Sequence, residues 1–106
     1  MNELLKLLEE GIDLLKRYNV KWFKILMKMK AELLNIKTKE EGSCFLKNNE
    51  LNIYGGMGSL YDIFICPENG NVADNFDIAN EQLEDYRKRL SREWQRLKKE
   101  KEGVTY

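Results

Sequence analysis

The chain has 106 residues, of which 42% are hydrophobic and 34% charged, and its net charge is zero. This length supports one hydrophobic core, so we expect a single domain over residues 1–106. There is no histidine, which removes the usual general base and most zinc sites. No apolar run reaches the roughly 20 residues that a membrane span needs, and no signal peptide is visible. The composition therefore favours a cytoplasmic protein that is not an enzyme and that uses no cofactor, metal or membrane.

Two amphipathic helices are predicted at the N-terminus. Within residues 3–18, the leucines fall on one half of a helical wheel and the charged residues on the other. Gly11 lies on the apolar half, where its missing side chain lets another element approach closely. Residues 20–36 are apolar over most of the circumference, which predicts the central helix of the fold. We expect four large side chains to be mostly buried: Trp22, Phe23, Leu26 and Leu90.

The middle of the chain is predicted to be less helical. Residues 37–50 are polar and indicate only a short helix over Ser43–Leu46. Leu60–Cys66 is rich in β-branched and aromatic residues, and an Asn-Gly turn follows it, which is typical of a strand in a hairpin. Leu51–Tyr54 and the residues around Val72 are further short-strand candidates. Two free thiols, Cys44 and Cys66, are expected rather than a disulfide.

The last helix is predicted to begin near Asp77 or at Asn80, a good N-cap residue, and to run to about Lys101. One face is apolar at three- and four-residue spacing: Leu83, Tyr86, Leu90, Trp94 and Leu97. The opposite face carries a basic stripe, which we expect to be solvated: Lys88, Arg92, Arg96 and Lys99. The predicted fold class is therefore mainly α (α+β), with two N-terminal helices, a small β-hairpin around a glycine-rich motif, and a long C-terminal helix.

The glycine-rich motif is Gly55-Gly56-Met57-Gly58-Ser59. It lacks the Gly-Lys-Ser/Thr ending of a phosphate-binding loop and the spacing of a dinucleotide-binding loop. Its glycines are better explained by positive φ and close chain approach. Ser59 and Asp62 have capping-box spacing, which is compatible with a single helical turn. We therefore predict a structural motif formed by five residues: Gly55, Gly56, Gly58, Ser59 and Asp62.

The segment Gly55–Cys66, with the following Glu68-Asn69-Gly70, resembles a family of small uncharacterised bacterial proteins. In that family a Gly-Gly-Met-Gly-Ser-(Leu/Phe)-Asn-Asp motif runs into an apolar strand, an Asn-Gly turn and a helix that opens with Asn-Glu-x-Leu. The opening Asn80-Glu81-Gln82-Leu83 matches, whereas Tyr61 stands where the family usually has Asn. The resemblance covers roughly residues 55–97. The small size and sporadic occurrence of the family resemble those of immunity proteins of toxin systems.

Charge is unevenly distributed, because residues 41–85 hold nine acids and one lysine. Either these acids pair within the fold or they form an acidic surface for a basic partner. We predict a negative patch centred on Glu68, Asp74 and Asp77, with Asp62 as a further partner contact. The same acids could hold a hard cation, but no Asp-x-Asp-x-Asp-Gly loop is present and capping explains them better, so no metal is expected.

The leading functional prediction is an immunity protein whose acidic surface covers the basic active site of a cognate toxin domain. One alternative is a small nucleic-acid-associated protein that uses the basic stripe of the last helix. The stripe is interrupted by acids and has no aromatic platform, which argues against nucleic acid. A second alternative is an enzyme that uses Asp62 and Glu68. The sequence is also compatible with a homodimer.

Overall fold

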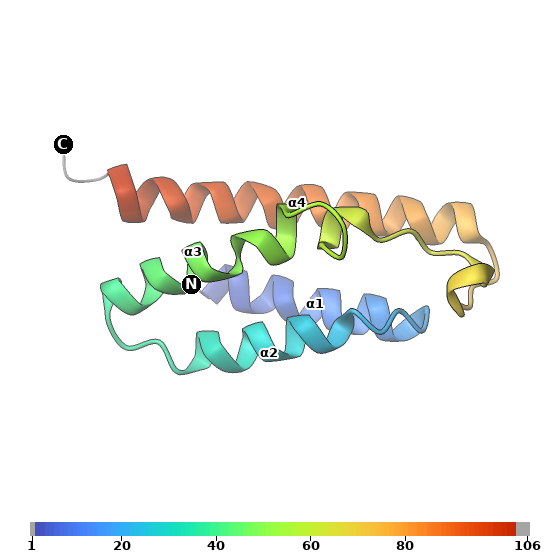
Figure 1. The fold of residues 1–106 in the computed structure, drawn as a ribbon, viewed down its shortest axis with the longest axis horizontal. Helices are drawn as coiled ribbons and strands as arrows, with labels where there is room; N and C mark the ends of the chain where they lie inside the picture. Colours follow the sequence, from blue (N-terminus) through green and yellow to red (C-terminus); the bar gives the residue numbers. More distant parts are fainter. Residues whose placement is uncertain (1, 104–106) are drawn as a thin grey trace.

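Helices dominate the computed structural model, which describes residues 2–103 (Figure 1). Four α-helices run alternately in opposite directions along a body of 48 × 24 × 23 Å. They are α1 (Asn2–Arg17), α2 (Phe23–Leu34), α3 (Lys39–Tyr54) and α4 (Phe76–Gly103). Two short 3-10 turns, η1 (Leu60–Asp62) and η2 (Pro67–Asn69), lie on the connection between α3 and α4.

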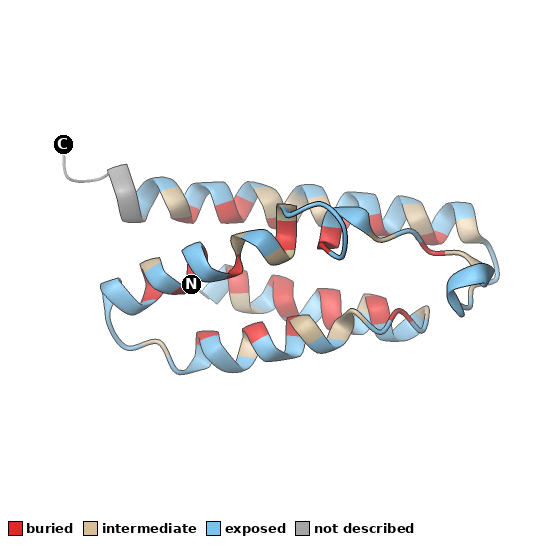
Figure 2. Ribbon diagram, in the orientation of Figure 1, coloured by how far each residue is buried: buried red, intermediate tan, exposed pale blue. Residues whose placement is uncertain are grey.

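One continuous core holds the helices together. The helices α1 and α3 each pack against both α2 and α4, and the buried residues line the inward faces (Figure 2). Twelve large side chains are almost completely buried: Leu4, Leu8, Leu15, Leu26, Met29, Ile53, Leu60, Ile65, Leu83, Tyr86, Leu90 and Trp94. Within the described range, no helix combines the length and the apolar character needed to cross a membrane.

The patterns of the first and last helices are confirmed. All seven charged residues of the predicted polar half of α1 are exposed, and the apolar half faces the core. The five predicted core residues of α4 are buried, and the basic stripe on its opposite face is exposed. Leu26 and Leu90 are fully buried as expected, and Trp22 and Phe23 are partly buried against the same core.

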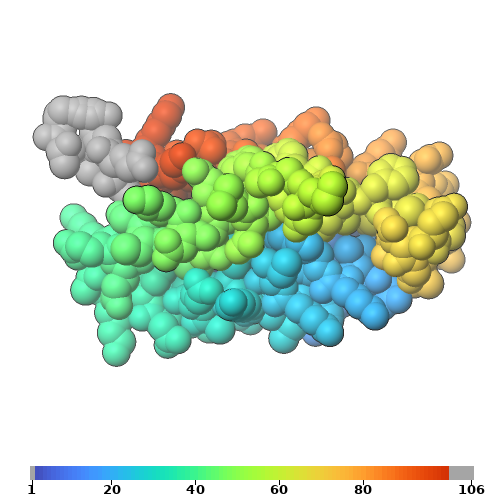
Figure 3. Space-filling model, in the orientation of Figure 1, coloured from blue at the N-terminus to red at the C-terminus, as the bar shows by residue number. Residues whose placement is uncertain are grey.

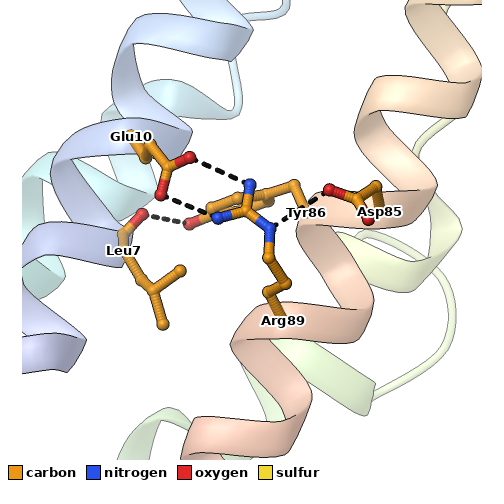
Figure 4. Close-up of polar contacts among 5 residues, drawn as sticks. All are labelled: Leu7, Glu10, Asp85, Tyr86 and Arg89. Carbon is orange, nitrogen blue, oxygen red and sulfur yellow. Dashed lines mark hydrogen bonds and ion pairs between the residues drawn. The ribbon is translucent and has the colours of Figure 1, made fainter.

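Polar contacts join α1 to α4 beside this core (Figure 4). The hydroxyl of Tyr86 donates to the carbonyl of Leu7 at 2.8 Å, inside the core. At the surface, both terminal nitrogens of Arg89 donate to Glu10, at 2.9 and 3.0 Å, and its Nε donates to Asp85. The Glu10 hydrogen bonds raise the pKa of Arg89 and so favour the charged form of its guanidinium.

The prediction that residues 20–36 form the central helix is wrong. The main contacts of α2 are with α1 and α3, so it occupies one corner of a four-cornered bundle. The apolar residues of α2 that lie outside its contacts with α1 and α3 are therefore exposed. Met27 is 47% exposed and Leu34 61% exposed.

A full helix, α3, replaces the largely polar loop expected before Leu51. It begins with a capping box, in which the Thr38 hydroxyl accepts from the Glu41 amide and the Glu41 carboxylate accepts from the Thr38 amide. This cap satisfies the free amides of the first turn and offsets weak helix propensity. Leu51–Tyr54, expected as a strand, is the last turn of the same helix.

The predicted β-hairpin is also wrong, because residues 2–103 contain no strand. Residues 63–66 are extended, but side chains rather than a second strand satisfy their backbone. Asn80 of α4 accepts from the Ile65 amide and donates to the Ile65 carbonyl, both at 2.8 Å. Arg87 donates to the Ile63 carbonyl, and Asn71 accepts from the Cys66 amide. The fold is therefore all-helical, and α4 takes the place of the missing partner strand.

Asn80 is consequently not the N-cap of the last helix. The helix starts four residues earlier, at Phe76, and Asn75 caps it by accepting from the Ile78 amide at 3.1 Å. Both residues are asparagines within one short stretch, so the sequence alone does not show which one caps the helix and which one binds the extended segment.

Candidate functional site: the glycine-rich loop and the acidic end

The glycine-rich loop turns the chain sharply after α3. Gly55 ends the helix, and its amide donates to the Leu51 carbonyl at 2.9 Å. Gly56 and Gly58 then adopt φ angles of 82° and 84°, in the left-handed region that other residues resist. The positive φ expected of the glycine-rich motif is thus present at both glycines.

Hydrogen bonds brace the loop from within and from α2. Ser59 donates to the Gly56 carbonyl through both its amide and its hydroxyl. Asp62 accepts from the Gly58 amide at 2.9 Å, and the indole of Trp22 donates to the Gly58 carbonyl at 3.0 Å. The helical turn expected after Ser59 is present as η1. Ser59 makes no capping bond to it, because its hydroxyl is turned back to Gly56.

Met57 stands at the tip of this braced loop and is 96% exposed. The loop thus holds a large apolar side chain in water on an ordered backbone. Phe64, on the extended segment that follows, is 62% exposed. Exposed apolar residues are common singly, and it is a group of them on one surface that marks a contact site. The sequence pattern points to the glycines and does not identify either of these side chains as exposed.

Tyr61, which replaces the asparagine of the resembled motif, has a packing role here. Its ring stacks on Tyr54 with centroids 5.4 Å apart, and the guanidinium of Arg87 lies 5.7 Å from its centroid. Burial lowers the pKa of Arg87, and the Glu84 carboxylate opposes that change. The Arg87 guanidinium also bonds the Ile63 carbonyl, so Tyr61 and Arg87 together join the loop to α4.

The loop between α1 and α2 is tied to the segment after η2. Asn19, at a φ of 56°, donates to the Gly70 carbonyl, and Asn71 donates to the Asn19 carbonyl. The Val72 amide donates to the Tyr18 carbonyl at 3.0 Å. This network closes the end of the bundle at which η2 and the start of α4 lie (Figure 1).

The nine acids of residues 41–85 divide into two groups. Five of them are used inside the fold, as helix cap, loop brace or ion-pair partner: Glu41, Glu50, Asp62, Glu84 and Asp85. The other four are exposed and make no ion pair or side-chain hydrogen bond with the described part of the chain: Glu68, Asp74, Asp77 and Glu81. All four belong to η2, the segment after it and the start of α4, and we call them the acidic end.

A shallow groove of about 530 Å³ lies at the acidic end. Asp74, Val72 and Ile78 line it together with Arg17 and Tyr18. Val72 is 56% exposed and Ile78 50% exposed, so apolar surface and an unpaired acid share one concave surface. In the space-filling view, the segment from the glycine-rich loop to η2 runs along one face of the molecule (Figure 3).

The predicted site residues are thus brought together only in part. Glu68, Asp74 and Asp77 belong to the acidic end, whereas Asp62 accepts a loop amide and acts as a brace. No group of three or more potential ligands for a metal ion occurs among the described residues. Cys44 and Cys66 are free thiols, the first exposed and the second half-buried.

The basic stripe of α4 is partly neutralised. Arg96 forms ion pairs with Glu93 and Glu100, both at 2.6 Å. The hydrogen bonds from Arg96 lower the pKa of Glu93, which keeps this carboxylate charged although it is largely buried. Of the four residues of the stripe, Arg96 is therefore the one whose charge is already used within the helix and is less available to a phosphate backbone.

Comparison with known proteins shows one family. No curated protein and no solved structure matches the chain. A family model described as "Domain of unknown function (DUF6966)" matches residues 18–74, which include α2, α3, the glycine-rich loop and η2. The ends of this range meet in space, because the Tyr18 carbonyl accepts from the Val72 amide. Since the match covers more than half of the sequence, the chain belongs to the DUF6966 family.

Proposed function

We propose that this chain is a cytoplasmic binding protein without enzymatic activity, and specifically an immunity protein that neutralises a toxin domain. The observation that carries the proposal is the acidic end. Glu68, Asp74, Asp77 and Glu81 remain unpaired within one short stretch, although the chain as a whole is neutral. Such a concentration of one sign attracts a partner of the opposite sign.

Apolar surface beside these acids supports a protein partner. Val72 and Ile78 line the groove that also contains Asp74, and Met57 and Phe64 are exposed on the preceding segment. Protein interfaces combine a few apolar anchors with a polar rim, and anchors on a braced backbone lose little entropy on binding. A hard cation or a small anion would have no use for these side chains.

The mechanism is electrostatic and steric. The acidic end accelerates encounter with the basic active site of a toxin, such as that of a nuclease, and this acceleration weakens with salt. The apolar groove then prolongs the complex, and the body of the bundle blocks access of the substrate. No reacting group is needed on this chain.

The test first asks whether a gene beside that of this protein encodes a toxin domain, and then measures the binding of that domain. The double variant Glu68→Lys/Asp74→Lys should fold normally and associate about tenfold more slowly at low salt, as measured by surface plasmon resonance. The control Glu3→Lys/Glu40→Lys makes the same charge change at two other exposed acids and should keep the wild-type rate.

Two outcomes would contradict the proposal at different levels. A toxin domain that binds both variants at the same rate would show that the acidic end is not the contact. A chain that binds no neighbouring gene product but is retained on heparin at physiological salt would overturn the immunity role and favour a nucleic-acid partner.

A further inference from the structure

A second candidate surface lies between α1 and α2, and it shares no residue with the acidic end. A groove of about 430 Å³ runs between the two helices. Its apolar part comes from Ile12 on one side and from Met27, Ala31 and Leu34 on the other. Met27 and Leu34 are the exposed apolar residues that the corner position of α2 leaves uncovered.

Charges of opposite sign flank the groove. On α1, Glu9, Asp13 and Lys16 line it. Glu9 is paired with Lys30 and Lys16 lies over the ring of Phe23, so Asp13 is the exposed acid that is left unpaired. On α2, Lys24 and Lys28 lie three residues before Met27 and Ala31, so they flank the apolar row on the side away from α1. Both lysines are exposed, and no described side chain pairs with them.

The register of the two helices places these charges at the same height. Lys30 pairs with Glu9 at 3.2 Å, and the ammonium of Lys16 lies 5.3 Å from the ring centroid of Phe23. In an antiparallel pair tied at these two points, Asp13 lies level with Leu26, midway between Lys24 and Lys28.

We propose that a second copy of this chain covers the groove, in a symmetric dimer whose two-fold axis runs parallel to the helices. Such an axis brings α1 of each copy against α2 of the other. Asp13 of one copy then faces Lys24 and Lys28 of the other, while Met27 and Leu34 of the two copies meet in the middle. Because the acid lies on α1 and the two lysines lie on α2, the surface is complementary to a second copy of itself. A surface with charges of only one sign would repel its own copy.

The interface is of modest size, so its dimer is expected to populate at micromolar to submillimolar concentration. Sedimentation equilibrium from about 10 μM to about 500 μM should show the wild-type mass rising towards twice the 12.6 kDa of one chain. Leu34→Glu should abolish the rise without unfolding the protein, because Leu34 is mostly exposed.

Charge reversal tests the arrangement itself. Asp13→Lys makes both banks of the groove basic, and Lys24→Glu/Lys28→Glu makes both acidic, so each variant alone should sediment as a monomer. Mixed in equal amounts, they should form a heterodimer, because each basic bank then faces an acidic one. Glu3→Lys, a matched reversal on α1 away from the groove, should dimerise like the wild type.

Each remaining outcome would overturn the proposal. A wild-type protein that stays monomeric across the whole range has no such dimer. A wild-type dimer that survives Asp13→Lys and Lys24→Glu/Lys28→Glu uses another surface. Monomeric variants that do not associate when mixed exclude the opposed packing of α1 and α2. None of these outcomes depends on whether a toxin domain binds the acidic end.

Discussion

Tyr86 of α4 occupies the space that a side chain at Gly11 of α1 would need. A Cβ built on Gly11 would lie 2.1 Å from the Tyr86 hydroxyl oxygen and 2.7 Å from a methyl carbon of Leu26. Because the glycine leaves this space free, the phenol reaches the Leu7 carbonyl one turn earlier in α1 (Figure 4). Three helices therefore meet at a position where only glycine fits.

Gly11→Ala should lower the free energy of unfolding by about 2–4 kcal/mol, although alanine favours the helix by about 1 kcal/mol. The cost comes from moving a buried tyrosine and breaking its hydrogen bond. Urea denaturation followed by circular dichroism measures it. In a Tyr86→Leu background the same substitution should cost at least 1 kcal/mol less, since the ring is gone. If Gly11→Ala lowers the free energy of unfolding equally in both backgrounds, the contact between residue 11 and the Tyr86 ring does not cause the loss.

The stability contributed by Tyr86 should depend on pH in the alkaline range. Burial, and secondarily the charge of Glu10, raises the pKa of this phenol above the value of about 10 that it has in the unfolded chain. Above pH 10 the unfolded state therefore loses a proton that the folded state keeps, so stability falls as pH rises. Tyr86→Phe should cost about 1 kcal/mol at pH 7.

This difference between wild type and Tyr86→Phe should shrink between pH 10 and pH 11, because only the wild type loses the protonation-linked stability. Comparing the two proteins removes the effects of the other tyrosines and the lysines, which both share. A gap that stays constant up to pH 11 would mean that Tyr86 titrates normally in the folded state.

The two end helices could be predicted from sequence because their apolar residues repeat with the helical period and all face one core. Gly11 could be recognised as a close-contact site for the same reason, although its partner Tyr86, 75 residues later, could not. The corner position of α2 was missed because an apolar circumference is compatible both with a helix surrounded by others and with a helix that leaves residues such as Met27 exposed. Which of the two arrangements occurs depends on how all four helices pack together.

The errors in the middle of the chain have a different origin. The Thr38-x-x-Glu41 spacing was visible in the sequence and marks the start of α3, but the polar residues after it have weak helix propensity. For Leu60–Cys66, β propensity correctly indicated extended backbone over part of the segment. Propensity does not say what pairs with that backbone, and here Asn80 does so from a helix.

The acidic end was predicted from the sequence as a negative patch. The sequence could not show which acids of residues 41–85 are used inside the fold and which stay unpaired. Asp85 pairs with Arg89 at the i,i+4 spacing of a helix, which the sequence shows, whereas Glu50 pairs with Lys98 across two helices, which local spacing does not show. The patch consists of the acids left over after those pairs form. Met57 and Phe64 were overlooked because an apolar residue in a short segment is first assigned to the core.

Gly58→Val should destabilise the protein by about 1–3 kcal/mol through backbone strain alone. Apart from the two adjacent residues, no heavy atom lies within 4 Å of a Cβ at Gly56 or Gly58, so contact of the Cβ with the rest of the fold is not the cause. Gly58→Asn is the matched variant, because asparagine tolerates positive φ, and it should cost less than half as much. Thermal denaturation compares the two, and equal midpoints would show that the left-handed conformation is not required.

Asn80→Asp tests the two hydrogen bonds that join Asn80 to the backbone of Ile65. The new carboxylate can still accept from the Ile65 amide, but it has no proton to donate to the Ile65 carbonyl, which would face a negative charge. We expect a loss of about 1–3 kcal/mol at pH 7. Asn69→Asp is the matched control, because Asn69 makes one exposed bond to the Phe64 carbonyl, and it should cost less than 1 kcal/mol.

The pH dependence of Asn80→Asp identifies the cause of this loss. Facing a carbonyl raises the pKa of the new carboxyl in the folded state, so the folded state holds its proton to a higher pH than the unfolded state does. Stability relative to wild type should therefore recover as pH falls from 7 towards 4, when the protonated carboxyl can donate to Ile65. Urea denaturation at a series of pH values measures this recovery. If the stability lost on Asn80→Asp is the same at pH 4 and pH 7, the hydrogen bonds of the Asn80 side chain do not hold the extended segment. The burial of Ile65 would then hold it instead.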